Sequence, residues 1–126
     1  MRRNISVPGL GHGDQPIPLA AVVGGLLATG GISGRDPETG SIPEDPAAEV
    51  AQAFANLRAI LDAAGASADD VLKVTVFVKD RDIRQHVNPV WVELFPDPQS
   101  RPARHTLEAN LSGMRLQLEC LAVVST

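Results

Sequence analysis

Two polar residues near the carboxyl-terminal end of the chain are hard to explain by folding alone. Arg104 ends the segment RPAR, and Glu119 interrupts the apolar run LQLECLAV. An arginine presents a planar fork that can donate two parallel hydrogen bonds to a carboxylate. A carboxylate inside an apolar strand must be paired or must take part in acid/base chemistry. The two residues therefore indicate either a salt bridge between strands or a site that binds a small carboxylate and activates water.

The elements that would position these residues predict one α+β domain over residues 1–126. The first helix is the most secure, because Asp45 suits the N-cap, Pro46 suits the first helical position and Gly65 supplies a stop after an apolar helical period. The glycine-rich stretch 30–34 and the turn sequence 36–40 that follows it are expected to stay at the surface. The other expected elements are strands at 19–23 and 26–29 around a Gly24-Gly25 turn, a central strand at 73–79, a second helix at 82–95, and strands at 105–110 and 116–124. Pro89 must lie in the first turn of the second helix or kink it. This order predicts a mixed sheet with both helices on one face.

Two-residue alternation predicts which side of the sheet each residue faces. In the last strand, Cys120 belongs to the core face, while Glu119 belongs to the other face. That other face is also expected to carry Arg115, Gln117, Leu121 and Val123. Together with Phe77 and Thr106 it is too apolar to stay in water, which indicates association between subunits. Within its own strand, Arg104 shares a face with Thr106.

Several classes of function are disfavoured by composition and spacing. The net charge of −4 and the sequence pI of about 5.2 disfavour a nucleic-acid partner. The three histidines (His12, His86 and His105) lack the spacing of a metal site, and the glycines lack a phosphate-loop pattern. The apolar run 19–28 is too short to span a membrane, and nothing resembles a secretory signal. Because it has a single cysteine and therefore no internal disulfide, the chain is expected to be cytoplasmic. We expect no bound metal and no membrane partner.

Taken together, four segments resemble the reactive-intermediate deaminase family, also called RidA, YjgF or the endoribonuclease L-PSP family. They are ATGGISG at 28–34, DVLKVTVFVKD at 70–80, RPAR at 101–104 and LECLAV at 118–123. The resemblance covers about residues 26–124 and implies a chorismate-mutase-like fold. It also implies a homotrimer in which the sheets form an inner barrel, with ligand clefts between subunits.

The resemblance further implies a chemistry and a set of site residues. Family members hydrolyse enamines and imines derived from amino acids to a 2-oxo acid and ammonia, without a cofactor. By similarity, Arg104 would bind the substrate carboxylate and Glu119 would position or activate water. The matching cleft positions are Thr29, Gly30, Gly31, Asn88 and Thr106.

The chain departs from the family at a tyrosine expected in its N-terminal part. It contains no tyrosine, and the matching segment reads GDQPIPLA at 13–20. A cysteine common in the family is replaced by Thr106. The missing tyrosine favours a non-catalytic trimer that binds small carboxylates and regulates other proteins, whereas the retained Glu119 favours a deaminase. Sequence leaves both hypotheses open.

Overall fold

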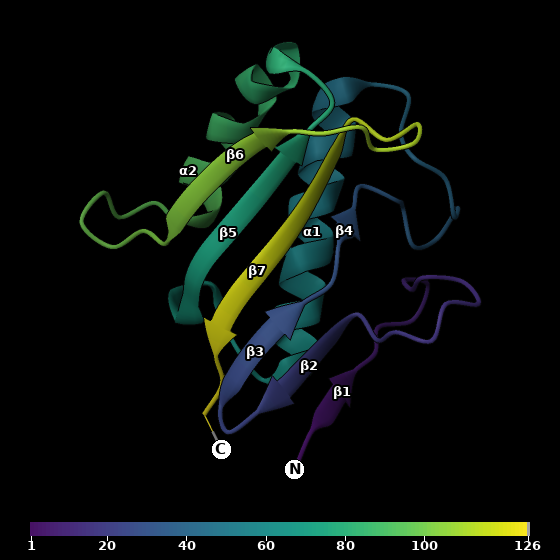
Figure 1. Ribbon diagram of the computed structural model, residues 1–126. Helices are drawn as coiled ribbons and strands as arrows, with labels where there is room; N and C mark the ends of the chain where they lie inside the picture. The colour runs from purple at the N-terminus through teal and green to yellow at the C-terminus, as the bar shows by residue number, and fades with distance from the viewer. Residues whose placement is uncertain (126) are drawn as a thin grey trace.

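A seven-stranded mixed sheet and two helices on one of its faces form the structure, a computed structural model that describes residues 1–125 (Figure 1). The helices are α1 (Pro46–Ala64) and α2 (Val87–Leu94). The strands are β1 (Arg3–Ile5), β2 (Ala20–Val23), β3 (Leu26–Thr29), β4 (Ile32–Ser33), β5 (Val71–Val78), β6 (Ala103–Glu108) and β7 (Leu116–Val123). Their order is β1-β2-β3-β7-β5-β6, with β4 paired to β7, and only β5 and β6 run parallel. The predicted α+β class is confirmed.

The predicted hairpin between β2 and β3 is present. Val23 pairs with Leu26, and the two residues between them, Gly24 and Gly25, have φ angles of 58° and 85°. A two-residue hairpin turn of this kind requires positive φ at both central positions, which glycine adopts without strain. The two glycines therefore fix the register of this hairpin.

Helix α1 begins and ends where the sequence predicts. The Asp45 side chain accepts a hydrogen bond from the backbone N–H of Ala48 at 3.0 Å, and Pro46 is the first helical residue. At the other end Gly65 has a φ of 81°, and its N–H donates to the carbonyl of Asp62. Both ends thus have partners for backbone groups that a helix leaves unsatisfied.

The second predicted helix is only partly correct. Residues 81–86 form a tighter 3-10 helix, η2 (Arg81–His86), and the α-helix begins at Val87. The Asp80 side chain starts η2 by accepting from the N–H of Asp82 at 3.0 Å. Of the two placements that the sequence allows for Pro89, the structure has the first: it lies in the first turn of α2, where its missing N–H breaks no helical hydrogen bond. Another short 3-10 turn, η1 (Ala68–Asp70), leads into β5.

The predicted surface segment is correct at 36–40, where the chain turns and residues 38–40 are exposed, but wrong at 32–34. Ile32 is only 4% exposed, and with Ser33 it forms β4, which pairs with Leu118 and Gln117 of β7. A side chain on Gly34 would collide with the backbone of α1, so this glycine permits close packing and does not mark a turn. A glycine can mark either a turn or a place where two segments pack closely, and the neighbouring residues in the sequence do not distinguish these two cases.

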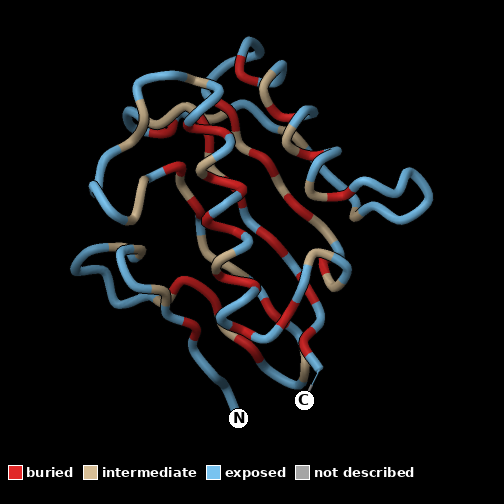
Figure 2. The backbone as a smooth tube through the Cα atoms, turned by 180° about the vertical axis from the view of Figure 1, so that it is seen from behind, coloured by how far each residue is buried: buried red, intermediate tan, exposed pale blue. Residues whose placement is uncertain are grey.

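The two faces of the sheet differ as the alternation predicts. The residues of β5 and β7 that face the helices are buried: Val74, Val76, Val78, Leu116, Leu118, Cys120 and Ala122 (Figure 2). We call the other side the open face. Its large exposed apolar residues include Val23 (53%), Leu26 (52%), Leu107 (38%), Leu121 (39%) and Val123 (53%).

Two side chains lie on the side of the sheet opposite to the one that alternation predicts. Thr106 pairs with the buried Val76 and therefore lies on the helix side, while Leu107 pairs with Phe77 on the open face. Arg115 precedes β7, and its side chain reaches back to α1. Strict alternation fails for Arg115 because that residue is not part of the strand.

Candidate active site

Glu119 lies on the open face of β7, near the middle of the sheet. It pairs with Thr75 of the central strand, and its side chain is exposed. A cavity of about 250 Å³ lies beside it. Its walls come from three adjacent strands: Ala28, Thr29, Lys73, Thr75, Glu119, Cys120 and Leu121. No ion pair within residues 1–125 involves Glu119, so its carboxylate is available to a ligand.

A β-bulge lies directly opposite Glu119. Ala28 of β3 pairs with Leu121, and Ile32 of β4 pairs with Leu118, so the three residues 29–31 face only Glu119 and Cys120. Thr29 stabilises this bulge, because its Oγ1 accepts from the Cys120 N–H at 3.0 Å and donates to the Gly30 carbonyl at 2.8 Å. Bulges re-aim side chains and backbone beside active sites. The predicted cleft positions Thr29, Gly30 and Gly31 are therefore next to Glu119.

Arg104 is held by an aromatic ring and forms no ion pair in the described chain. Its guanidinium carbon lies 4.8 Å from the centre of the Trp91 ring in α2. Partial burial lowers the pKa of Arg104, and the nearby charge of Arg84 lowers it further. An arginine oriented by a ring and facing another positive charge can bind an anion.

The two predicted catalytic residues lie on opposite faces of the sheet. Arg104 pairs with Val74, which is fully buried under the helices, whereas Glu119 pairs with Thr75. Directly paired residues point to the same side of a sheet. The salt bridge between Arg104 and Glu119 that the sequence left open does not form, and within one chain the two side chains do not converge.

The remaining predicted positions divide in the same way. Thr106 lies on the helix side of β6, two residues from Arg104. Asn88 is exposed in the first turn of α2, three residues before Trp91 and thus on a neighbouring part of the helix surface. One group, on the open face and its bulge, contains Glu119, Thr29, Gly30 and Gly31; the other, at the β6–α2 edge, contains Arg104, Thr106 and Asn88.

Cys120 belongs to the core, as predicted. It is 2% exposed, and burial raises the pKa of its thiol to about 12. The thiolate, which is the reactive form, is therefore scarce at neutral pH. Cys120 does not qualify as a nucleophile.

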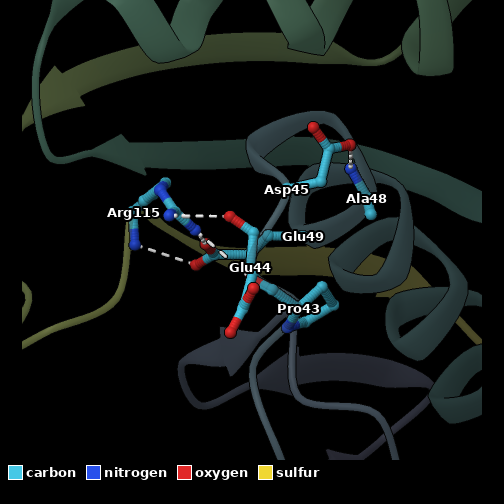
Figure 3. A network of polar contacts seen from close by, with 6 residues as sticks. All are labelled: Pro43, Glu44, Asp45, Ala48, Glu49 and Arg115. Carbon is cyan, nitrogen blue, oxygen red and sulfur yellow. Dashed lines mark hydrogen bonds and ion pairs between the residues drawn. The ribbon is translucent and has the colours of Figure 1, made fainter.

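A second acid–arginine pair was not recognised in the sequence. Glu49 is fully buried in α1, and its Oε1 accepts from Nη1 of Arg115 at 2.7 Å (Figure 3). Its Oε2 accepts from the backbone N–H of Arg115 at 2.8 Å, and the guanidinium also donates to the carbonyls of Pro43 and Glu44. The sequence does contain a signal for this buried position. Glu49 lies four residues before Ala53 and therefore on the apolar stripe of α1, which faces the core.

The described residues hold no cluster of three or more metal-ligating side chains. No helix within 1–125 is long and apolar enough to cross a membrane. The site therefore consists of an exposed carboxylate beside a bulge, on a sheet face that is otherwise largely apolar, and of an arginine at the sheet edge. The fold and the site together indicate a small α+β protein that binds a polar ligand on an otherwise apolar sheet face.

Comparison with known proteins identifies the family. The family model described as Endoribonuclease L-PSP matches residues 18–125, and the chain belongs to this family, which includes the RidA and YjgF proteins. The 2-iminobutanoate/2-iminopropanoate deaminase of Escherichia coli strain K12 is 36% identical over 104 residues, covering 80% of this chain and 81% of that protein.

Solved structures agree with the family assignment. A putative endoribonuclease from Thermotoga maritima has a TM-score of 0.89 and 33% identity, with 100% of both chains covered. The E. coli protein TdcF, solved with bound serine, has a TM-score of 0.87 and 28% identity, covering 98% of this chain and 99% of that one. The predicted fold family is confirmed.

Proposed function

We propose that this protein is a deaminase that hydrolyses 2-imino acids, and their enamine tautomers, to 2-oxo acids and ammonia. The single observation that carries the proposal is the unpaired Glu119 carboxylate, exposed beside a 250 Å³ cavity and a glycine bulge. The relative from E. coli named as a 2-iminobutanoate/2-iminopropanoate deaminase supports the same reaction.

The active site would form between two copies of the chain. Because Arg104 and Glu119 lie on opposite faces of one sheet, a single small substrate cannot contact both within one chain. If the open face of one copy packs against the β6 edge of the next, Glu119 of one copy approaches Arg104 of its neighbour. A head-to-tail interface of this kind forms a ring when the rotation between successive copies closes.

The open face has the character of a subunit interface. Leu26, Leu121 and Val123 are all exposed. They lie near one another, because Leu26 of β3 pairs with Val123 of β7 and Ala28 of β3 pairs with Leu121 of β7. Contiguous apolar surface of this kind marks an association site. The resemblance to the family implies a homotrimer with three clefts, and this is the assembly that we propose.

The chemistry needs an anchor and a base. Arg104 would hold the substrate carboxylate with two hydrogen bonds. Glu119 would take a proton from water as the C–O bond forms and the imine π electrons move to nitrogen. With a protonated imine as the substrate, this gives a neutral amine on the tetrahedral carbon, and Glu119 returns its proton to that nitrogen. The C–N bond then breaks with its electron pair leaving on ammonia, and Glu119 takes the hydroxyl proton as the carbonyl forms. No cofactor takes part in these steps.

The test is a coupled assay with an amino-acid oxidase that generates 2-imino acids. Ammonia release should be faster with the protein than in water alone, and Glu119→Gln and Arg104→Ala should each lower kcat/KM by about a hundredfold or more. Arg101→Ala is the control for the loss of a neighbouring positive charge, because Nε of Arg101 donates a hydrogen bond to the Phe95 carbonyl at 2.8 Å. If wild type gives no acceleration with any imino acid, the proposal is wrong.

A second function is favoured by one observation. E. coli TdcF was solved with bound serine, a small amino acid. The alternative is therefore a non-catalytic trimer that binds small carboxylates through Arg104. It predicts binding of 2-oxo acids without any acceleration of imine hydrolysis. RNA is not a proposed substrate, because a net charge of −4 repels phosphates.

A further inference from the structure

The cavity beside Glu119 contains a second charged side chain, Lys73 of the central strand β5. Lys73 and Glu119 are the charged members of its lining, and the other residues that line it are apolar or uncharged. Lys73 is only partly exposed, and its ammonium forms no ion pair within residues 1–125. An ammonium donates strong hydrogen bonds to carboxylates. Lys73 is therefore available to an anionic ligand in the same cavity as the proposed base.

Strand register places Lys73 on the same face of the sheet as Glu119. Strands β5 and β7 lie side by side, with Lys73 paired to Leu121 and Thr75 paired to Glu119 (Figure 1). Directly paired residues point to the same side, so both charged side chains project from the open face. They are diagonal neighbours, which lie about 7–8 Å apart and within reach of long side chains. A group of the size of a carboxylate can therefore lie between the ammonium and the Glu119 carboxylate.

A second β-bulge lies directly before Lys73. The register of β5 against β7 shifts between Val71 and Lys73, which makes Leu72 an extra residue, and its side chain is 59% exposed. The cavity therefore has a bulge on each side: residues 29–31 on the β3–β4 side and Leu72 on the β5 side. Bulges are frequent next to active sites, where they re-aim side chains. Both walls of the cavity have this feature.

The charges of the proposed reaction explain why a cation is needed here. A 2-imino acid carries a carboxylate, and Glu119 carries another when it acts as a base. Like charges in one small cavity repel, and the repulsion increases as a closing interface excludes water. The other titratable side chain on this part of the open face is His105, which pairs with Thr75 but does not belong to the described cavity lining. Lys73 is the cation that can offset this repulsion from within the cavity.

We propose that Lys73 is a further substrate-binding residue, whose ammonium donates a hydrogen bond to the substrate carboxylate and offsets its repulsion from Glu119. This inference rests on the proposed function, since it concerns the same site. It also divides the site between two copies of the chain: Lys73 and Glu119 come from the open face of one copy, and Arg104 comes from the edge of its neighbour. A carboxylate has enough lone pairs to accept from both cations.

The kinetic experiment compares Lys73→Met, which keeps a long side chain without the charge, with Lys73→Arg, which keeps the charge. Lys73→Met should raise KM about tenfold with little change in kcat, because the substrate carboxylate keeps its charge throughout the reaction. Lys73→Arg should restore most of the loss. Lys79→Met is the matched control, since Lys79 is the other lysine of the chain and is exposed at the end of β5, outside the cavity lining. An unchanged KM in Lys73→Met overturns the inference.

Binding of stable analogues separates this inference from the proposed function. By calorimetry, wild type should bind pyruvate more tightly than pyruvamide, which has a similar size but no charge. Lys73→Met should reduce that preference about tenfold, whether or not the protein accelerates imine hydrolysis. An equal preference in wild type and Lys73→Met overturns the inference and leaves the deaminase proposal intact. An equal loss of both compounds in Lys73→Met, or a changed oligomeric state, assigns Lys73 to the structure of the open face and also overturns it.

Discussion

The molecule contains two acid–arginine combinations that differ in almost every physical respect. Glu49 and Arg115 form a buried pair 2.7 Å apart, with both carboxylate oxygens bonded to Arg115. Glu119 and Arg104 are both exposed, have no ion-pair partner in the described chain and lie on opposite faces of the sheet. A satisfied pair fixes α1 to the start of β7. An unsatisfied pair leaves both groups able to meet a ligand, which is the arrangement that a binding site needs.

The largest effect is expected when two inactive variants are mixed. Arg104→Ala and Glu119→Gln should each have almost no activity. When they are co-refolded in equal amounts, about a quarter of the clefts in a head-to-tail ring receive an intact arginine and an intact glutamate. Activity should therefore rise from near zero towards that fraction of wild type, measured by ammonia release.

The control is a mixture of either variant with itself, which should restore nothing. If the co-refolded mixture remains as inactive as its parts while sizing shows an oligomer, then Arg104 and Glu119 do not act across a subunit boundary.

The buried pair should control stability. Breaking a buried salt bridge leaves an uncompensated charge and costs about 3–5 kcal/mol, and the partial exposure of Arg115 (31%) places the expected loss for Arg115→Met near the lower end. Denaturant unfolding of Arg115→Met and of Glu49→Gln/Arg115→Met would measure it. The double variant should recover part of the loss, because no buried charge remains. Equal stability of wild type and Arg115→Met would mean that the pair contributes little.

The contrast between the two pairs also explains what the sequence could reveal. Helix α1, the β2–β3 hairpin and the two faces of β7 follow from local rules: an N-cap at Asp45, glycines at 24 and 25, and alternation around Cys120. These features depend on neighbours in the chain. They could therefore be predicted without knowledge of tertiary contacts.

The features that were missed depend on contacts between distant segments. The Glu49–Arg115 pair joins residues 66 positions apart, and β4 exists because Gly34 allows close packing on α1. The side of the sheet occupied by Thr106 depends on the register of β6 against β5. The sequence predicts Arg104 and Glu119 as candidate site residues from their chemistry. Their separation onto two faces of the sheet follows only from the strand order and register.

The ring beneath Arg104 offers a smaller effect. Trp91 should orient the guanidinium, and a cation–π contact at an exposed site contributes about 0.5–1 kcal/mol. Trp91→Leu should therefore raise KM about two- to fivefold with little change in kcat. Phe54→Leu is the matched control, because Phe54 packs against Trp91 at a ring-centre distance of 6.4 Å and belongs to the core. An equal KM increase in Phe54→Leu would attribute the effect to core packing.

The smallest effect concerns Cys120, which is adjacent to Glu119 in the chain but faces the core. Burial raises the pKa of its thiol to about 12, so between the ordinary thiol value and that pH the folded chain keeps a proton that the unfolded chain has lost. The contribution of this thiol to the free energy of unfolding should be at its maximum below about pH 9. It should then decrease as the pH rises, by at most about 1.4 kcal/mol per pH unit.

Comparison of wild type with Cys120→Ala isolates this contribution, because the other titrating groups are common to both proteins. The difference in unfolding free energy between them should change in that direction from pH 8 to pH 10. The native thiol should also react slowly with a disulfide reagent at pH 8, at a rate that rises with denaturant. Rapid labelling of the native protein would show that the helix side of β7 opens to solvent. The contrast between a closed helix side and an open side that carries Glu119 would then no longer hold.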